Sequence, residues 1–451
     1  MGNSKKVGDI LKGNEINNNY ISMILKNPDA YINDYKNTVI KVANSNAKYK
    51  GKPVPFLYNP MFFSKSEEES LKSIMEKMMK IGDKVTDQFI KDESYRKLFG
   101  FPKFIEEMIL RENRYSINVP IARFDLFFKD DKNFKFCELN TDGSSAMNED
   151  NTIGRILMES KAIQDMSTNY SLYNRELIDK WVMESLSIFR KWDPNNNNPN
   201  VAIVDFVESG TSAEFLEFKK AYEKQGYNCI IVDPRELEYR QGNLYKDDYR
   251  IDLVYRRIVT FELIEKADEV QNFINAYMDD AMCVIGTIRS QVIHNKVFFK
   301  ILFDEQTHRF LEEDEIKFIY DHIPFTGLFK GSGSIFEEVL NNKDKYIMKP
   351  VDMNASQGVF VGRDLSFSDW KERLDKIFDT DYLYQEFITP YERDFIVFND
   401  SDFEIQKFKS IVGVFLYKRK YAGLYTRIGK ENIISGVTNY FTVPNLIVEK
   451  K

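Results

Sequence analysis

A predicted β-hairpin over residues 120–140 constrains this chain more than any other stretch. Two apolar-rich runs, 120–128 and 134–140, flank a short polar stretch, which is the pattern of two antiparallel strands joined by a turn. If Asp131 and Lys132 form a two-residue loop, the pairing of the strands follows from symmetry. The hairpin then decides which polar side chains meet on one face of a sheet.

This pairing places two carboxylates opposite each other. It sets Asp125 against Glu138 and Arg123 against Asn140, with all four side chains on one face, because residues i and i+2 share a face of a strand. Opposed side chains lie roughly 5 Å apart at Cβ, and like charges there repel. A hard divalent cation explains the pair, and Asn140 adds a neutral oxygen ligand. A solvated sheet face beside Arg123 also explains it, so the hairpin alone leaves both interpretations open.

The cysteines and histidines show no spacing typical of a metal site or a redox motif. Cys137, Cys229 and Cys283 are widely separated, and the three histidines form no HxxH or HExxH pattern. Cys137 adjoins Glu138 in the predicted strand, so we expect it to point to the opposite face, into the core. Buried thiols indicate a reducing compartment.

The composition is that of a globular chain with two or three packed units. Of the 451 residues, 43% are hydrophobic and 29% charged, and the net charge of −7 predicts no nucleic-acid partner. No run of 18 apolar residues predicts a membrane span, and the first residues lack the hydrophobic region of a signal peptide. The expectation is a cytoplasmic protein without a membrane partner. The oligomeric state stays open, a homodimer included.

A long amphipathic helix is predicted over residues 66–90. Ser66 and Glu69 would form a capping box at its start. Apolar residues follow at helical spacing and predict a stripe that packs into the core, although a methionine-rich stripe also suits a partner groove. The stripe consists of Leu71, Ile74, Met75, Met78 and Met79.

Residues 201–233 predict a strand–helix–strand unit after an Asn- and Pro-rich linker at 193–200. VAIVDF and YNCIIVD resemble buried strands of a parallel sheet, and IDLVYRR at 251–257 adds a third. Ligands bind beyond the carboxyl ends of such strands. The substrate candidates there are Ser209, Gly210, Thr211, Ser212, Arg256 and Arg257. Ordinary loop residues are the alternative interpretation.

The last third of the chain holds a second set of polar residues. Residues 345–364 predict a strand, a Gly-containing loop and a second strand, with Lys349 at the end of the first. Residues 380–390 predict another strand that ends near Gln385 and Glu386. Lysines, arginines and Mg²⁺ are what phosphoryl transfer requires, because its catalysis is positioning plus stabilisation of charge. The sequence contains no GK[ST] P-loop, no G-x-S-x-G elbow and no GxGxxG after a strand.

The order of these motifs resembles the circularly permuted ATP-grasp ligases, and most closely the synthetase domain of glutathionylspermidine synthases. The motifs are R-x-D at 123–125, E-x-N at 138–140, H-N-K at 294–296, K-P at 349–350, N-x-S-x-G at 354–358, Y-Q-E at 384–386, and Gly423–Arg427. The metal hairpin precedes the nucleotide lysines, as in the permuted branch. The resemblance covers about residues 120–430.

The resemblance implies an α/β chain with a circularly permuted ATP-grasp fold and an inserted Rossmann-like, pre-ATP-grasp domain. Residues 1–195 would hold the N-terminal helices and the metal-binding hairpin. Residues 199–290 would form the pre-ATP-grasp-like βαβ domain. Residues 291–451 would form the nucleotide-binding lobe and lid and return to the core.

The resemblance also implies a role for each matching residue. Mg²⁺ would be held by Asp125, Glu138 and Asn140, and Arg123 would contact the transferred phosphoryl group while Arg427 binds the carboxylate substrate. The residues expected to bind ATP are Lys296, Lys349, Ser356, Gly358, Gln385, Glu386, Phe387 and Ile388, with Gly358 allowing close approach to the phosphates. The residues expected to contact substrate are Ser144, Ser145, Glu149, Ser209, Thr211 and Arg257.

The implied activity is that of an ATP-dependent carboxylate–amine ligase. It would form an acyl-phosphate from a small carboxylate or peptide, which an amine then attacks to give an amide, ADP and phosphate. The alternatives are an inert ATP-grasp-like nucleotide-binding or scaffold protein, and a phosphotransferase that uses the same site. The chain has no Cys/His amidase motif, and its Gly143-Ser144-Ser145 segment differs from the polyamine ligases, so glutathione and spermidine are not implied as substrates.

Overall fold

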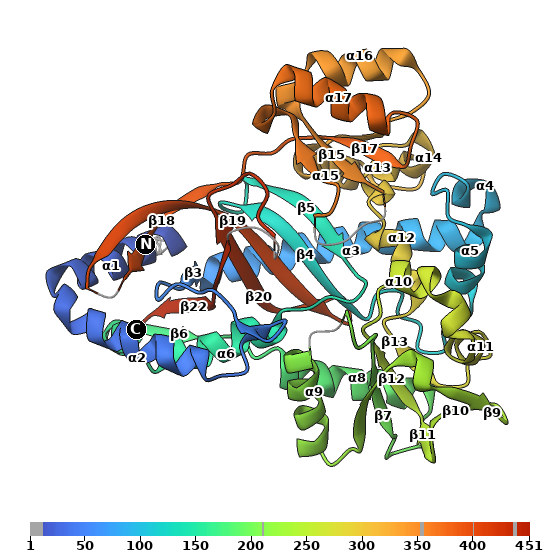
Figure 1. Ribbon diagram of the computed structural model, residues 1–451, viewed down its shortest axis with the longest axis horizontal. Helices are drawn as coiled ribbons and strands as arrows, with labels where there is room; N and C mark the ends of the chain where they lie inside the picture. The colour runs from blue at the N-terminus through green and yellow to red at the C-terminus, as the bar shows by residue number, and fades with distance from the viewer. Residues whose placement is uncertain (1–11, 210–211, 352–355, 400, 436–439) are drawn as a thin grey trace, which may run out of the picture.

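An antiparallel sheet in the middle of the molecule contains the predicted hairpin (Figure 1). The computed structural model describes residues 12–209, 212–351, 356–399, 401–435 and 440–451. The sheet order is β21 (Tyr440–Val443), β20 (Lys420–Gly429), β19 (Phe403–Tyr417), β4 (Ile121–Phe128) and β5 (Phe134–Asn140), with β18 (Glu392–Phe398) paired to β19. The hairpin β4–β5 therefore lies beside strands from the end of the chain.

The hairpin has the predicted opposed pairs but a wider turn. Asp125 lies opposite Glu138, and Arg123 lies opposite Asn140. The loop spans residues 129–133 rather than the predicted two residues, because the Asp130 carboxylate accepts hydrogen bonds from two backbone N–H groups within it. Next to this loop Phe128 pairs with Phe134, one residue away from the partner that a two-residue loop would give it. This difference in register is reversed farther along the strand.

A β-bulge at Cys137 reverses that shift. The register changes between Asp125 and Leu126, where β5 contains one extra residue, and the charged pairs regain the predicted alignment. Cys137 packs beside Phe127 and Ile411, on the face that carries Asp125. The prediction that it points to the opposite face was therefore wrong, because a bulge breaks the alternation of side chains.

Helix α3 (Lys65–Lys91) packs against β19 and β20 and starts at a different capping box from the predicted one. The Ser64 hydroxyl accepts a hydrogen bond from the Glu67 N–H, and the Glu67 carboxylate accepts one from the Ser64 N–H at 2.8 Å. The predicted pair, Ser66 and Glu69, lies two residues later. The predicted stripe of Leu, Ile and Met is buried, which confirms its packing in the core.

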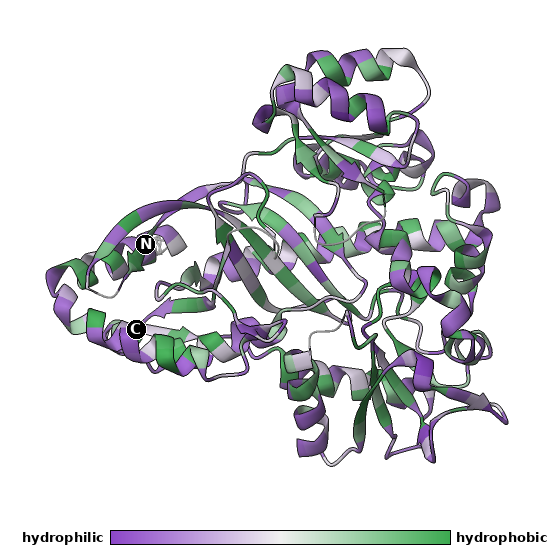
Figure 2. Ribbon diagram, in the orientation of Figure 1, coloured by the Kyte–Doolittle hydropathy of each residue, from purple (hydrophilic) through white to green (hydrophobic). Residues whose placement is uncertain are grey.

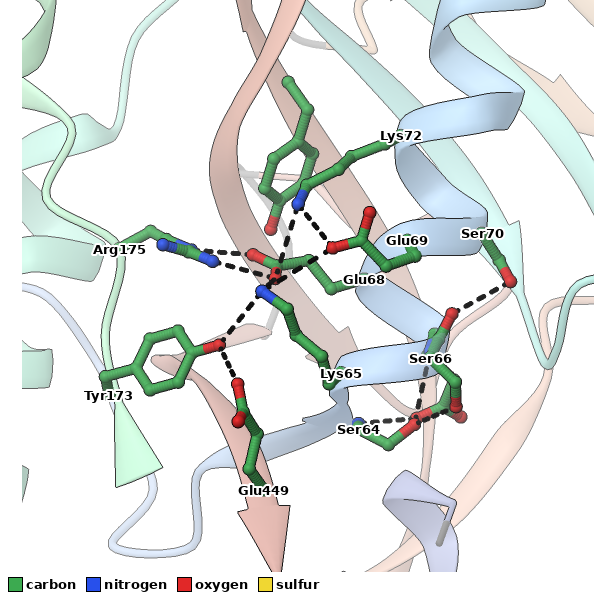
Figure 3. Close-up of polar contacts among 12 residues, drawn as sticks. Ser64, Lys65, Ser66, Glu68, Glu69, Ser70, Lys72, Tyr173, Arg175 and Glu449 are labelled. Carbon is green, nitrogen blue, oxygen red and sulfur yellow. Dashed lines mark hydrogen bonds and ion pairs between the residues drawn. The ribbon is translucent and has the colours of Figure 1, made fainter. Parts of the chain in front are cut away.

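A buried carboxylate fixes the first turn of α3 to the neighbouring strands (Figure 3). The side chain of Glu68 is fully buried and accepts two hydrogen bonds from the Arg175 guanidinium, at 2.6 and 2.8 Å. Lys65 donates to the same carboxylate at 2.7 Å and to the Tyr173 hydroxyl at 3.3 Å. Tyr173 lies on β6 (Tyr170–Tyr173), so this cluster joins the helix to that strand.

Acid is expected to weaken this anchor. Burial alone would raise the pKa of Glu68, but hydrogen bonds from Arg175 and Lys65 outweigh it and lower the pKa from 4.5 to about 2. A carboxyl with a depressed folded pKa stabilises the fold above its unfolded pKa and loses that effect as pH falls toward the folded one. Glu68→Gln should therefore lower the free energy of unfolding by about 3 kcal/mol at pH 7 and by little at pH 2.

Urea unfolding of both proteins between pH 7 and pH 2 measures this difference. Glu69→Gln is the matched control, because the Glu69 side chain is 55% exposed and one residue away. If Glu68→Gln lowers the free energy of unfolding by the same amount at pH 2 as at pH 7, the low pKa of Glu68 is contradicted.

The predicted βαβ unit is confirmed. β7 (Val201–Val204) pairs in parallel with β8 (Cys229–Val232) after α9 (Ser212–Lys224), and β12 (Leu253–Arg256) and β13 (Cys283–Ile285) continue the parallel sheet beyond β7. These strands are almost uniformly hydrophobic (Figure 2), because helices cover both faces. α8 (Ile178–Trp192) and α9 lie on one face, and α11 (Gln271–Met278) lies on the other. We call this part the parallel-sheet unit.

A separate small lobe, here called the upper lobe, spans residues 326–386. Its antiparallel sheet has the order β14 (Thr326–Leu328), β17 (Tyr382–Glu386), β15 (Tyr346–Pro350) and β16 (Phe360–Val361). Helices α16 (Gly333–Asn341) and α17 (Phe367–Ile377) cover one face of this sheet (Figure 1). Trp370 of α17 is fully buried between them and the sheet. The opposite face of the sheet is directed toward the central sheet.

The last strand of the chain returns to its first elements. β22 (Asn445–Lys450) lies between β3 (Met61–Ser64), to which it is parallel, and β6. The helices α1 (Gly13–Lys26), α2 (Pro28–Ala43), α6 (Met147–Met158) and α7 (Lys161–Met166) pack with these strands into one hydrophobic cluster.

Short elements complete the fold. They are β1 (Lys48–Tyr49), β2 (Lys52–Pro53), α4 (Glu93–Arg96), α5 (Lys103–Leu110), β9 (Glu238–Arg240), β10 (Asn243–Lys246), β11 (Tyr249–Ile251), α10 (Thr260–Glu265), α12 (Gln291–His294), α13 (Val297–Leu302), α14 (Glu305–His308) and α15 (Glu313–His322). Within the described ranges, no helix combines the length and the apolar character needed to cross a bilayer.

Candidate active site

A cavity of about 450 Å³ is lined by the central sheet, the upper lobe and the parallel-sheet unit. It brings together most of the side chains that the sequence singled out. The predicted residues in its lining are Arg123, Glu138, Asn140, Ser144, Ser145, Glu149, Ser209, Arg257, Lys296, Lys349, Ser356, Gln385, Glu386, Phe387, Ile388 and Arg427. Asp125 and Gly358 are not in the lining, and Thr211 lies outside the described residues.

Glu138 is kept ionised by cations from distant parts of the chain. Burial alone would raise its pKa, but nearby positive charges and one hydrogen bond outweigh burial and lower the pKa to about 2. The groups that lower it are, in decreasing order, Lys296, the hydrogen bond from Asn140, Arg427 and Lys349. The Lys349 ammonium also donates to the Cys137 carbonyl at 3.3 Å, so the upper lobe contacts the hairpin directly.

Asp125 lies behind the lining and holds two arginines. Arg123 forms a fork on its carboxylate, with hydrogen bonds of 2.7 and 3.0 Å, and Arg427 donates to the same carboxylate at 2.8 Å. Asp125 is 1% exposed, so both ion pairs are shielded from water. Because Arg123 and Arg427 both line the cavity, this shared carboxylate orients two cations at one wall.

The oxygen donors in the lining fit a hard divalent cation. Glu138 is ionised, and Asn140 lies beside it with its amide nitrogen 3.0 Å from a Glu138 oxygen. The described residues contain no group of three or more His, Cys, Asp and Glu side chains placed to hold a metal. A cation here would therefore take further ligands from water and phosphate, as Mg²⁺ does. The role of Asp125 as a third ligand stays a prediction, since its oxygens accept hydrogen bonds from arginines.

The segment 385–388, here called the hinge, leads from the upper lobe to β18 of the central sheet. The buried Gln385 side chain donates to the Thr326 hydroxyl at 2.8 Å, which fixes its orientation. The N–H groups of Glu386 and Phe387 donate to the carbonyls of Phe325 and Lys345 at 2.8 and 2.7 Å. Those two N–H groups are therefore already committed to hydrogen bonds within the lobe.

Gly358 serves the packing of the upper lobe. Its φ of +70° is a conformation that favours glycine, and an added Cβ would lie 2.6 Å from the Tyr382 hydroxyl. That hydroxyl donates to the Gly358 carbonyl at 3.2 Å. The glycine therefore allows close approach of a tyrosine, in place of the expected close approach to a phosphate. Ser356 lies in the cavity lining, and the preceding residues 352–355 lie outside the described ranges.

The loop after β5 shapes the end of the cavity away from the hinge. The Ser144 hydroxyl donates to the Asn140 carbonyl at 2.7 Å, and the Ser145 carbonyl accepts from Arg123 at 3.0 Å. Glu149, at the start of α6, accepts hydrogen bonds from the hydroxyls of Tyr425 at 2.7 Å and Thr442 at 3.0 Å. Burial raises the pKa of Glu149, and these two hydrogen bonds offset it only in part.

The two arginines that end the third predicted strand have different environments. Arg257 lines the cavity, and it is paired with Glu214 at 3.0 Å and donates to the Ser144 carbonyl. Arg256 is fully buried, forms a 2.5 Å ion pair with Asp142 and is absent from the lining, so its prediction as a pocket residue was wrong. In a strand, neighbouring side chains point to opposite faces, and only one of the two can reach the cavity.

Comparison with known proteins identifies the family. The family model described as glutathionylspermidine synthase preATP-grasp matches residues 56–448. The chain belongs to the glutathionylspermidine synthase family. This is a family of ATP-grasp-type ligases, in agreement with the mixed α/β fold. No curated protein matches the chain.

A solved structure shares the fold of this glutathionylspermidine synthase family member. It is a glutathione synthetase-like effector (GSS30) from Globodera pallida in its apo form. The TM-score is 0.55 at 11% sequence identity, over 92% of this chain and 96% of the effector. At this identity the likeness concerns the fold alone.

The cavity of this glutathionylspermidine synthase family member also contains residues that the sequence reasoning missed. Asp205 directly follows the buried strand β7, and Glu262 lies on α10, where its carboxylate accepts a hydrogen bond from Ser209 at 2.8 Å. The rule that ligands bind beyond the carboxyl ends of parallel strands could have found Asp205. Tyr49 and Tyr440 also line the cavity, and nothing in their local sequence indicates it.

Proposed function

We propose that this chain is an ATP-dependent carboxylate–amine ligase that acts through an acyl-phosphate. The observation that carries the proposal is the convergence on Glu138 of cations from three distant segments, namely Lys296, Lys349 and Arg427. A buried carboxylate surrounded by lysines and arginines suits a triphosphate with its divalent cation, because the cations match the phosphates and the carboxylate matches the metal.

The nucleotide would lie between the hinge and the hairpin. Lys296 and Lys349 would bind its phosphates, and the hinge residues 385–388 would contact the base. Glu138 and Asn140 would hold Mg²⁺, which neutralises phosphate charge when bound. Ser356 lies on the same side and would contact the phosphates.

The paired arginines would bind the groups that react. Arg123 and Arg427 are oriented by Asp125, so their guanidinium groups are fixed before a ligand arrives. They would bind the substrate carboxylate and the transferred phosphoryl group and stabilise the negative charge that develops when an amine attacks the acyl carbon. The attacking nitrogen then loses a proton, phosphate leaves, and an amide remains. Exclusion of water protects the acyl-phosphate from hydrolysis.

The proposed division of the chain follows the permuted order. Residues 1–195 would supply the metal-binding hairpin, residues 199–290 the pre-ATP-grasp unit, and residues 291–451 the nucleotide lobe and the strands that return to the central sheet. Helix α8 belongs to the first range but packs with α9 and β13 of the second. By packing, the boundary between the first and second ranges would therefore lie before α8. Ser144, Ser145, Ser209 and Arg257 would contact the substrates.

Mg·ATP is expected to stabilise the full chain against heat. A ligand at 100 times its Kd that binds only the folded state adds about 2.7 kcal/mol to the free energy of unfolding. Differential scanning fluorimetry with Mg·ATP should show a rise in Tm that Lys349→Met removes. Lys371→Met is the matched control, because that side chain is 50% exposed and outside the cavity.

Two results would separate the alternatives. An unchanged Tm at millimolar Mg·ATP would exclude every function that depends on this nucleotide site. A raised Tm without ADP release over a panel of amino acids, peptides and amines would favour an inert nucleotide-binding protein.

A further inference from the structure

Six aromatic rings form a continuous row outside the cavity, on the upper lobe and the helices next to it. Neighbouring rings in the row have centroids 5.4 to 6.1 Å apart, and none of the six lines the cavity. In order along the row, the rings are those of His308, Tyr320, Phe303, Phe325, Tyr384 and Tyr346. We call this surface the aromatic row.

Strand alternation directs two of these rings away from the cavity. Ile347 of β15 and Leu383 of β17 line the cavity, whereas Tyr346 and Tyr384 pack into the hydrophobic cluster of α16 and α17. Neighbouring side chains of a strand point to opposite faces, so the two tyrosines lie on the outer face of the sheet. The aromatic row and the cavity are therefore on different sides of the upper lobe.

A glycine allows the row to continue from the upper lobe to the helices. Gly327 of β14 pairs with Tyr384, and a Cβ added at this glycine would lie 2.5 Å from the tyrosine ring. The ring of Tyr384 therefore lies across β14, where it reaches the ring of Phe325. Helix α13 packs against β14, and Figure 1 shows it next to the sheet of the upper lobe. The rings of Phe303, after α13, and Tyr320, on α15, extend the row.

The centre of the aromatic row is open to solvent. Tyr320 is 59% exposed and Phe325 is 46% exposed. The hydroxyls of Tyr320 and Tyr384 form no hydrogen bond with the part of the chain that the structure describes. Exposed aromatic rings with unused hydrogen-bond donors are typical of a surface that binds another protein.

The end of the row at α16 is acidic. Glu338 of α16 accepts a hydrogen bond of 3.0 Å from the Tyr346 hydroxyl and forms no ion pair with a described side chain. α16 contains no basic residue. Lys345 and Arg363 lie in a separate hollow of about 300 Å³, whose lining also includes the Glu386 carboxylate. The charge that a ligand meets at α16 is therefore negative.

We propose that the aromatic row binds a proline-rich segment of another protein, with basic residues at the end of the segment that meets α16. Proline side chains are apolar and stack on aromatic rings, and a polyproline II helix is already extended, so its binding costs little conformational entropy. The carbonyls of such a helix form no internal hydrogen bonds, and the hydroxyls of Tyr320 and Tyr384 can donate to them. A lysine or arginine beyond the last proline would pair with Glu338. The proposal is independent of the ligase function, because the row lies outside the cavity.

Fluorescence anisotropy of the full chain with a fluorescein-labelled peptide, a run of prolines followed by two arginines, tests this surface. The comparison peptide has glycine and serine in place of the prolines, and only the proline peptide should bind. Phe325→Ala and Tyr320→Ala should each weaken its binding about fivefold, which corresponds to about 1 kcal/mol. Tyr320→Phe should weaken it about threefold through the lost hydrogen bond. Glu338→Gln should weaken it about threefold at low salt and less at high salt.

Phe367→Ala is the matched control, because this phenylalanine of α17 is 53% exposed and is not part of the aromatic row. Circular dichroism shows whether each variant is folded, and Tyr320→Phe and Glu338→Gln keep the test valid if an alanine variant is not. The proposal is overturned if the two peptides bind equally well, or if the folded variants of Tyr320 and Phe325 all bind the proline peptide as wild type does.

Sedimentation velocity tests the other possible occupant of the row, a second copy of this chain. Wild type should be unaffected in its oligomeric state by Tyr320→Ala. A wild-type dimer that this substitution dissociates, together with no binding of the proline peptide, would make the row an interface between two copies and would overturn the proposal.

Discussion

Glu138→Gln is expected to lower Mg·ATP-dependent ADP release by about 10²- to 10³-fold. The substitution keeps the size of the side chain and removes the negative charge that Lys296, Lys349 and Arg427 surround. A neutral amide is a poor ligand for Mg²⁺, so the cation would be lost from the phosphates. The measurement is ADP release over a panel of acids and amines, together with the Kd for ATP with and without Mg²⁺.

The Kd measurement makes the prediction specific. Glu138→Gln should weaken binding of Mg·ATP while changing the affinity for metal-free ATP much less. Glu404→Gln is the control, because Glu404 is an exposed residue of the same sheet. If ADP release and the Mg²⁺ dependence both survive in Glu138→Gln, the hairpin does not hold the metal.

Arg256→Met is expected to lower the free energy of unfolding by about 3–5 kcal/mol. Arg256 and Asp142 are 0% and 1% exposed at the side chain, and methionine keeps most of the volume while removing the charge. Asp142 would remain buried with hydrogen bonds from the Thr260 N–H and the Gln291 amide but without its arginine partner. Urea unfolding followed by circular dichroism measures the loss.

A double variant decides whether the uncompensated charge causes the loss. Asp142→Asn in the Arg256→Met background should recover part of the stability, because an amide costs less to bury than a carboxylate. Lys376→Met, which breaks an exposed ion pair with Glu372, should cost under about 1 kcal/mol. A double variant no more stable than Arg256→Met would show that lost packing, and not charge, explains the effect.

The sequence predicted the charged pairs of the hairpin for partly wrong reasons. Symmetry about a two-residue loop gave the correct partners of Asp125 and Arg123, although the turn is wider and a bulge at Cys137 compensates. The alternation of side chains along a strand is a local rule, so it does not predict an extra residue such as the one in β5. The same limit applies to the start of α3, where Ser64 and Glu67 cap the helix and a similar pair follows two residues later.

Sequence patterns could not predict the cavity residues whose positions depend on tertiary contacts. Continuous apolar runs placed the strands of the βαβ unit, and a period-3.6 pattern placed the core stripe of α3, because burial leaves a signal in the sequence. Tyr49 carries no such signal, and its place in the cavity lining follows a segment in which Asn46 is hydrogen-bonded to Asn148 on α6 and to Glu217 on α9. Arg256 and Arg257 are adjacent and chemically identical, and only the direction of the strand separates their environments.

The position of β22 has a consequence for how this chain folds during synthesis. β3 precedes the hairpin in the chain, yet its partner β22 comes after the parallel-sheet unit, the upper lobe and most of the central sheet. While the ribosome is still translating, the hydrophobic cluster around α1, α2 and β3 lacks the strand that closes it. The parallel-sheet unit contains its own contiguous strands and can form earlier, whereas the cluster around α1, α2 and β3 can close only after β22 has been made.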